Sequence, residues 1–354
     1  MLYPDLPLWA SIAFVVVGLV ALAWSSDLFV AGAASLAKAL GISPFIIGMV
    51  IIGFGTSAPE LCVSAMSGLA GKSNLSLGNA YGSCIFNIAA ILGLAAVIRP
   101  IRTKPATVFV AGPLLALVSL LSMWLLRDGA CTRGDALLLL GLFAVLMPLY
   151  CWFDQRKAGG APAAPAPAAA EGPSGGGADS KGRVLAVSAV KLVVGLAVLV
   201  GSSHVLVWGA VDLAKAMGVS DLMIGLTIVA VGTSLPELAS AVASARRGEN
   251  EFVLGNIVGS NLFNTLAVVG LASSITAAEG FSRCILTRDL PVMTALSVSL
   301  VAFGANWRAF GRRAFGRRGR ITRIEGAAWL VAFAAYAAVM ICQELAAGRL
   351  DGAQ

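Results

Sequence analysis

The chain has little charge and almost no histidine. Of its 354 residues 12% are charged and 58% are hydrophobic, one is a histidine, and the mean hydropathy is +0.88. A soluble globular protein needs far more polar surface than this composition supplies. The sequence therefore predicts an integral membrane protein.

Cysteine is scarce, and its spacing carries no motif. The six cysteines form no CxxC pair and are scattered along the chain, which argues against a disulfide framework and a zinc site. We expect small, membrane-buried side chains at Cys62, Cys84, Cys131, Cys151, Cys284 and Cys342. The net charge of +7 rests on basic residues in short loops between apolar runs, where they serve orientation. Nucleic acid is thereby excluded as a partner.

Long apolar runs are abundant. About ten of them reach the roughly 20 residues that a helix needs to cross a hydrocarbon core of ~30 Å. They centre near residues 20, 55, 87, 115, 142, 197, 232, 263, 298 and 335. The predicted fold is an all-α integral membrane protein with about ten transmembrane helices.

The loops predict an orientation. With ten spans, 18 of the 25 Lys and Arg residues fall on one side, which should be the cytoplasm. Both termini are then expected outside, in a multi-pass protein of the cell (inner) membrane. Residues 156–183 are rich in Ala, Pro and Gly and should form a disordered cytoplasmic linker. This linker divides the chain into five-helix halves, 1–155 and 184–354.

The two halves are copies of each other. A shift of 177 residues aligns 41–98 with 218–275 without a gap, and 25 of the 58 positions are identical. The likeness continues more weakly from 16–39 to 193–216. An odd number of spans per half makes the second copy enter the membrane from the opposite side. Inverted repeats of this kind are typical of secondary transporters with a binding site near the midplane.

Both copies carry a glutamate in the middle of an apolar run. The motifs are GTSAPE at 55–60 and GTSLPE at 232–237. A carboxylate at this depth is costly, which makes Glu60 and Glu237 candidates for a functional site. Thr56 and Ser57 precede Glu60 by four and three residues, so on a helix all three side chains point to one side.

The same motif contains helix breakers. Pro59 lacks an N–H and crowds the carbonyl of Gly55, while Gly53 and Gly55 loosen the preceding turn. A break inside the membrane is tolerated only where protein or a polar cavity satisfies the freed carbonyls. Carboxylate, hydroxyl and carbonyl oxygens are the ligands that hard cations such as Ca²⁺ and Na⁺ prefer.

The next span adds a polar stripe at steps of four residues. Amide and hydroxyl side chains supply neutral oxygens from one helical face at Asn79, Ser83 and Asn87, and again at Asn256, Ser260 and Asn264. For the first asparagine of each stripe, hydrogen bonding between helices is an equal alternative to ion contact. The GxxxG spacings at Gly78/Gly82 and Gly255/Gly259 predict a close approach to the neighbouring helix.

At these residues the sequence resembles the sodium/calcium exchanger family of cation/calcium antiporters, whose two repeats carry G-T-S-x-P-E and G-N-x-x-G-S-N-x-x-N/D patterns. The resemblance implies that Glu60 and Glu237 are the central Ca²⁺ carboxylates, with the hydroxyls of Thr56 and Thr233 beside them. Neighbouring Na⁺ sites would be completed by the backbone carbonyls of Gly53 and Ala230 and by Ser57, Ser83, Ser234, Ser260 and Asn87. Asn264 completes this set of candidate ion ligands.

Two positions depart from the family pattern. Cys84 stands where the family commonly has Asn, which Asn261 keeps in the second repeat, and we expect a packing effect there. The neutral Asn264 replaces an Asp of the potassium-dependent branch, which argues against K⁺ co-transport. Two GTSxPE copies favour Na⁺ over H⁺ as the driving ion.

The expected function is therefore electrogenic exchange of Na⁺ for Ca²⁺ by alternating access, with no enzymatic activity, no cofactor and no obligate protein partner beside ions and lipids. An H⁺-coupled cation antiporter and a cation channel are the alternatives. A serine hydrolase using Ser57 or Ser234 is disfavoured, because the single His204 would have to serve one of two equivalent serines. A lone membrane Ser or Thr more often bonds its own helix backbone.

Overall fold

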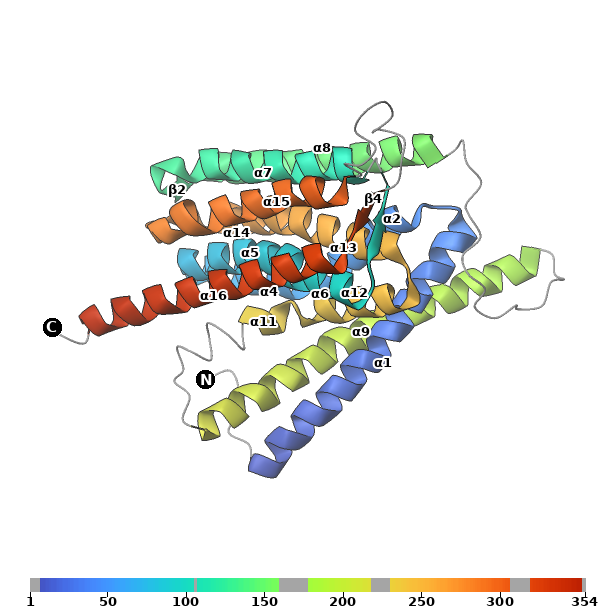
Figure 1. Cartoon of the computed structure of the whole chain (residues 1–354), viewed down its shortest axis with the longest axis horizontal. Coiled ribbons are helices and arrows are strands. Elements are labelled where there is room, and N and C mark those ends of the chain that lie inside the picture. The colour runs from blue at the N-terminus through green and yellow to red at the C-terminus, as the bar shows by residue number, and fades with distance from the viewer. Residues whose placement is uncertain (1–6, 105–106, 159–177, 218–229, 306–318, 352–354) are drawn as a thin grey trace.

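The computed structural model is almost entirely helical (Figure 1) and describes residues 7–104, 107–158, 178–217, 230–305 and 319–351. In the first half the elements are α1 (Leu8–Leu40), α2 (Pro44–Ile46), η1 (Ile47–Ile52), α3 (Gly53–Thr56), α4 (Ala58–Leu69), α5 (Ser73–Phe86), η2 (Asn87–Leu92), α6 (Gly93–Ile98), β1 (Ile101–Thr103), η3 (Thr107–Ala111), α7 (Gly112–Leu125), η4 (Leu126–Asp128), β2 (Ala130–Cys131) and α8 (Arg133–Ala158). The segments η1, η2 and η3 are π-helical, and η4 is a 3₁₀ turn.

Apart from η4, the described elements of the second half follow the order of their counterparts in the first half. The elements of the second half are α9 (Ala178–Ala216), α11 (Ala230–Thr233), α12 (Leu235–Arg247), α13 (Asn250–Leu262), η6 (Phe263–Val268), α14 (Val269–Ile275), β3 (Ala278–Glu279), η7 (Ile285–Asp289), α15 (Leu290–Gly304), β4 (Gly319–Ile321) and α16 (Arg323–Asp351). The segments η6 and η7 are π-helical.

Within the described ranges eight helices are long and apolar enough to cross a membrane, and a bent pair, Pro44–Thr56 with Ala58–Leu69, makes a ninth span. The predicted span near residue 232 is described only from Ala230, where α11 begins. Residues 218–229, which would complete it, lie outside the described residues.

The corresponding spans α8 and α16 begin with the same device. Thr132 Oγ1 accepts a hydrogen bond from the Asp135 N–H, and Asp135 Oδ2 accepts one from the Thr132 N–H. Thr322 and Glu325 make the same reciprocal pair before α16. These capping boxes satisfy backbone donors that a helix start leaves unpaired.

The helices α1 and α9 lie side by side and run diagonally across the remaining helices (Figure 1). Glycines allow their close approach: a Cβ at Gly18 would lie 2.8 Å from Leu206 Cβ, and one at Gly195 would lie 2.7 Å from Phe29 Cα. Gly18 and Gly195 are 177 residues apart in the sequence, as are Phe29 and Leu206. The contact is thus made twice, with the roles of the two halves exchanged.

Other contacts are exchanged in the same way. The helix α6 packs on α16 through Gly93, and α14 packs on α8 through its counterpart Gly270. Two short antiparallel pairs, β1 with β4 and β2 with β3, also join the halves. The sequence did not predict these strands, because their partners are two or three residues long and lie far apart in the chain. The paired contacts support the predicted two-repeat organisation.

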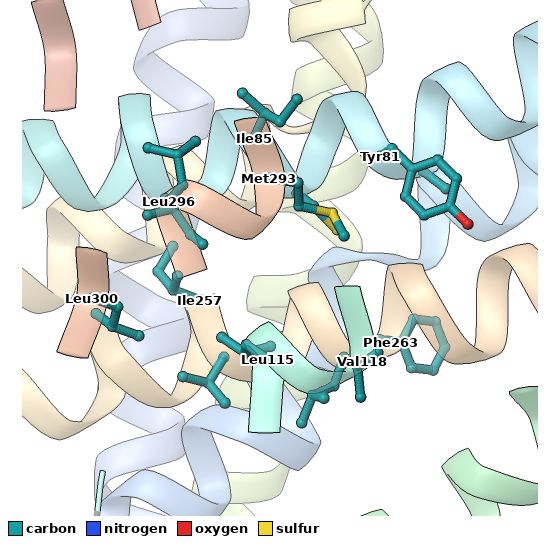
Figure 2. Close-up of a cluster of buried hydrophobic side chains, with 14 of the residues drawn as sticks. Tyr81, Ile85, Leu115, Val118, Ile257, Phe263, Met293, Leu296 and Leu300 are labelled. Atoms are coloured by element: carbon teal, nitrogen blue, oxygen red, sulfur yellow. The ribbon is translucent and has the colours of Figure 1, made fainter. Parts of the chain in front are cut away.

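The core lies where α5, α7, α13 and α15 meet, and Figure 2 shows Ile85, Leu115, Ile257, Met293 and Leu296 converging there. Every residue of the apolar window in Asn250–Ile275 is buried, so this span occupies the centre of the molecule. The apolar windows of α1, α9 and α16 are only 28%, 17% and 11% buried inside the protein. That outer surface suits contact with lipid.

Some predictions fall at the edge of what the structure describes. The helix α8 continues to Ala158 and α9 begins at Ala178, so both ends of the predicted linker are helical. The rest of the linker and most of the Arg-rich loop at 308–323 lie outside the described residues. Of the cysteines, Cys84 and Cys131 are buried inside the protein, Cys151 and Cys284 are partly buried, and Cys62 and Cys342 lie on its surface. All six are free thiols.

Candidate functional site

Each GTSxPE motif interrupts its helix at the serine. Ser57 separates α3 from α4 with φ −83° and ψ 5°, and the two parts of the span meet at 45°. Ser234 separates α11 from α12 with φ −93° and ψ 11°. Pro59 and Pro236 follow two residues later, and because proline has no N–H, the carbonyls four residues earlier lose their helical donors. The broken helices predicted from the sequence are present.

Each serine reaches across to the glutamate of the other half. Ser57 Oγ donates to Glu237 Oε1 at 2.9 Å, and Ser234 Oγ donates to Glu60 Oε1 at 2.8 Å. Both carboxylates are fully buried, and their Oε2 atoms have no hydrogen-bond partner among the described residues. The two halves thus build one site that contains two carboxylates, each with a free oxygen.

The sequence spacing predicted that Ser57 and Glu60 point to the same side of one helix. The helix breaks at Ser57, and the Ser57 hydroxyl bonds Glu237 instead. Thr56 Oγ1 lies 2.9 Å from the Ile52 carbonyl and 3.3 Å from Asn256 Oδ1. Its hydroxyl can donate to its own helix, which is the arrangement common for membrane threonines. A hydroxyl that donates in this way keeps its oxygen lone pairs for a cation.

Asn79 and Asn256 brace the glutamate helices. Asn79 Nδ2 donates to the Glu60 carbonyl at 3.2 Å and to Ser64 Oγ at 2.9 Å. Asn256 Nδ2 lies 3.5 Å from the Glu237 carbonyl and 3.0 Å from Ser240 Oγ. Of the two roles that the sequence left open for these amides, the structure shows bonding between helices.

Ser83 and Ser260 lie at the same junction, on α5 and α13. Ser83 Oγ is 3.2 Å from Ser234 Oγ, and Ser260 Oγ is 3.4 Å from the carbonyl of Gly53. The structure therefore brings the Gly53 carbonyl next to a hydroxyl of the other half. Ala230 and Thr233 are the first and last residues of α11, directly before the break at Ser234.

The last asparagine of each stripe lies at the change from α-helix to π-helix. Asn87 begins η2 and Asn264 is the second residue of η6, and both side chains are fully buried. Asn87 Nδ2 donates to Asn261 Oδ1 at 3.1 Å, whereas its Oδ1 has no partner among the described residues. Neither polar atom of Asn264 has one. Single π turns inside α-helices are frequent at functional sites.

Several residues that contact the site were not predicted from the sequence. Ser64 and Ser240 accept hydrogen bonds from Asn79 and Asn256. Ser64 follows Glu60 by four residues and Ser240 follows Glu237 by three, so the 177-residue shift does not align the two serines. Asn261 stands beside the predicted stripe rather than on it. The packing role expected for Cys84 is incomplete, because its Sγ lies 3.7 Å from the Asn261 carbonyl and 3.5 Å from Thr265 Oγ1.

The candidate cation ligands in this site are all oxygen atoms, from two carboxylates, hydroxyls, amides and backbone carbonyls. Hard cations select such sets, and no group of three or more His, Cys, Asp or Glu side chains suited to a metal occurs in the described ranges. Buried carboxylates are costly unless a positive charge neutralises them. A hydrolase is not favoured, since the candidate serines bond to glutamates while His204 is exposed on α9.

Comparison with known proteins agrees with this chemistry. The family model described as sodium/calcium exchanger protein matches residues 10–152 and 187–342. Inner membrane protein YrbG of Escherichia coli is 38% identical over 81% of this chain and 86% of its own length. Sodium/calcium exchanger MaX1 of Methanosarcina acetivorans is 30% identical over 81% of this chain and 89% of its own length.

The fold has a solved counterpart as well. A structure of the sodium-calcium exchanger NCX_Mj, soaked with Na⁺ and Sr²⁺, superposes with a TM-score of 0.76. The match covers 94% of this chain and 99% of the other at 28% sequence identity. The protein CaxA of Alkalimonas amylolytica is 41% identical over 91% of this chain and 96% of its own length.

Proposed function

The chain belongs to the sodium/calcium exchanger family, and on that premise we propose that it exchanges Na⁺ for Ca²⁺ across the cell membrane by alternating access. The observation that carries the proposal is the reciprocal pairing of Ser57 with Glu237 and of Ser234 with Glu60. This pairing supports a single site that takes one buried carboxylate from each half and has only oxygen atoms as candidate ligands. No cofactor and no catalytic residue is needed for this activity.

We assign Ca²⁺ to the two carboxylates. Their free Oε2 atoms and the hydroxyls of Thr56 and Thr233 would contact the ion, because Ca²⁺ takes six to eight oxygens. Na⁺ would occupy neighbouring positions formed by neutral oxygens. The groups proposed for Na⁺ are the carbonyls of Gly53 and Ala230 and the side chains of Ser57, Ser83, Ser234, Ser260, Asn87 and Asn264.

Exchange follows from competition for this one site. Two ionised carboxylates carry a charge of −2, which a single Ca²⁺ neutralises, whereas Na⁺ ions must spread over several partly neutral positions to displace it. With neither ion bound, the carboxylates would stand bare in a low-dielectric interior. The conformational change that moves the site between the two sides is then unfavourable unless ions are bound, which couples the two fluxes.

Na⁺ is the proposed coupling ion. Asn264 is neutral at the position where the potassium-dependent branch has Asp, so we propose that K⁺ is not co-transported. If more than two Na⁺ ions move per Ca²⁺, each cycle carries net charge, and the membrane potential contributes about 2.3 kcal/mol per charge for each 100 mV.

For the topology we propose two inverted five-helix repeats, 1–155 and 184–354, with a cytoplasmic linker and both termini outside. Arg99 Nη1 donates to the Arg246 carbonyl, and β1 pairs with β4 so that Arg102 lies opposite Arg320. Basic residues of the predicted cytoplasmic loops thus gather at one end of the molecule, which supports this orientation. A fluorescent protein that folds only in the cytoplasm should stay dark when fused after Gln354; a bright fusion would reverse the orientation.

The function is tested in proteoliposomes loaded with Na⁺, loaded with K⁺, or given a pH gradient without Na⁺. We expect ⁴⁵Ca²⁺ uptake from Na⁺-loaded vesicles only. Uptake driven by the pH gradient would assign the protein to H⁺-coupled transport. Unitary current steps in a planar bilayer would identify a channel instead.

A further inference from the structure

The contact between Cys84 and Asn261 joins two equivalent positions, because these residues are 177 apart in the sequence. Cys84 Sγ donates to the Asn261 carbonyl at 3.7 Å, and Asn261 Nδ2 donates to the Cys84 carbonyl at 3.4 Å. Each side chain therefore bonds the backbone of its counterpart. This part of the arrangement is symmetric although the residues differ.

Asn261 also does something that Cys84 cannot. Its Oδ1 accepts a hydrogen bond from Asn87 Nδ2 at 3.1 Å, which fixes the Asn87 amide and leaves Asn87 Oδ1 free. The equivalent anchor for Asn264 would be an amide oxygen at position 84. Cysteine has none, and its sulfur lies 3.5 Å from Thr265 Oγ1 instead.

Asn264 shows the consequence. Its side chain is fully buried, yet neither Nδ2 nor Oδ1 makes a hydrogen bond with any described residue. A buried amide normally has its donors and acceptors paired. The anchored Asn87 and the unanchored Asn264 are the same position in the two halves, so the asymmetry follows from the residue at position 84 and its counterpart 261.

We propose that Cys84 is a positioning residue that lowers the Na⁺ affinity of the site by leaving Asn264 unanchored. This inference rests on the proposed function, in which Asn264 is a Na⁺ ligand. A cation that binds to an amide oxygen must first order that side chain, whereas an anchored amide already presents its oxygen. The Asn264 side therefore binds Na⁺ more weakly than the Asn87 side.

The decisive variant is Cys84→Asn, which supplies the missing amide. Ordering one side chain in advance should lower the Na⁺ concentration at half-saturation about two- to tenfold. The Ca²⁺ half-saturation should change less than about twofold, because the carboxylates bind Ca²⁺ in the proposed site. A general packing effect would alter both values together.

The measurement is the rise in Tm of the purified full-length protein in detergent during titration with NaCl, with choline chloride as control, and separately with CaCl₂. Cys84→Ala is the matched control: it removes the thiol without supplying an amide and should not tighten Na⁺ binding. Asn261→Cys is the reverse change, which should release Asn87 and weaken Na⁺ binding about two- to tenfold. It tests the inference even if Cys84→Asn does not fold.

The titrations distinguish this inference from the proposed function. Tighter Na⁺ binding in Cys84→Asn alone, lost again when Asn264→Ala is added, supports the inference. A Na⁺ response equal to that of the wild type, or equal tightening in Cys84→Ala, overturns it and leaves the proposed function intact. A wild-type protein that responds to Ca²⁺ but not to Na⁺ overturns the Na⁺ coupling and this inference together.

Discussion

Ser57 Oγ lies 2.9 Å from Glu237 Oε1, although 180 residues separate the two in the chain. The contact is repeated by Ser234 and Glu60 at 2.8 Å. Because each half supplies the hydroxyl that holds the carboxylate of the other, neither half contains a complete site. Relative movement of the halves would disturb both pairs at once, so the proposed alternating access would directly affect the proposed ion binding.

Removing either serine hydroxyl should weaken ion binding. A hydrogen bond to a charged group contributes about 1.5–3 kcal/mol, so Ser57→Ala and Ser234→Ala should each lower Ca²⁺ affinity roughly ten- to hundredfold. The two losses should be similar, since the pairs are equivalent. Half-saturation of Ca²⁺ uptake measures the effect.

Ser119→Ala and Ser297→Ala are the matched controls. Among the residues that the structure describes, these buried serines bond the carbonyls of Leu115 and Met293 alone, four residues earlier in their own helices. We expect no change in half-saturation for either control. A change equal to that of Ser57→Ala would show that any buried serine has this effect. The reciprocal pairing would then not explain the loss of Ca²⁺ affinity.

The predicted close approach is wrong for Gly78 and Gly82, where a Cβ would meet no described atom within 4 Å, and is confirmed for Gly255 and Gly259. Close packing at this second GxxxG motif should be sensitive to a single methyl group. A Cβ at Gly259 would press directly against the Met49 carbonyl, so Gly259→Ala should lower stability by about 1–3 kcal/mol. At Gly141 on α8 a Cβ meets no described atom within 4 Å, and Gly141→Ala should leave Tm unchanged or raise it. Equal Tm values for the two variants in detergent would contradict this packing.

Outside the site, the buried carboxylate of Asp289 should be structural. Asp289 accepts hydrogen bonds from Arg288 Nε at 2.6 Å and from the Tyr336 hydroxyl at 3.0 Å, which links η7 to α16. Asp289→Ala removes the carboxylate that pairs with the partly buried Arg288, which keeps its hydrogen bond to Gln343, and should cost at least about 1.5–3 kcal/mol. Tyr336→Phe removes one hydrogen bond to a charged group and should cost about 1.5–3 kcal/mol.

The Tm in detergent reports both losses. The Ca²⁺ half-saturation should stay the same in each variant, because Asp289 and Tyr336 do not contact the site. A change in half-saturation without a loss of Tm would assign this cluster to transport instead.

Electrogenic exchange predicts a definite sign. In Na⁺-loaded vesicles more than two Na⁺ leave for each Ca²⁺ that enters, so net positive charge moves outward. An inside-positive potential should then speed ⁴⁵Ca²⁺ uptake, and an inside-negative potential should slow it. Equal rates at both potentials would indicate electroneutral exchange.

The sequence predicted the membrane fold and the helix breaks well because both are local consequences of composition and of Pro59 and Pro236. It could not predict partners across the halves. A shift of 177 residues shows that Ser57 and Ser234 are equivalent, but it does not show that each bonds the glutamate of the other half.

Two further features depend on tertiary packing that no spacing reveals. Position 84 lies off the polar stripe, yet it meets its own counterpart at Asn261. The pairing of β1 with β4 joins residues more than two hundred positions apart, in segments too short to carry a strand pattern. Contacts of this kind follow from how the halves assemble, which the amino-acid pattern of either half does not contain.

The central claim is that one carboxylate from each half forms a single Ca²⁺ site. It is tested most directly by Na⁺-driven ⁴⁵Ca²⁺ uptake in vesicles containing wild type, Glu60→Gln, Glu237→Gln or the control Glu279→Gln, whose side chain is exposed in β3. Losing one carboxylate charge removes about 4 kcal/mol or more, roughly a thousandfold in affinity. Both site variants should therefore fall to background without loss of Tm, while Glu279→Gln transports normally. Uptake at the wild-type rate by either site variant would contradict the shared site.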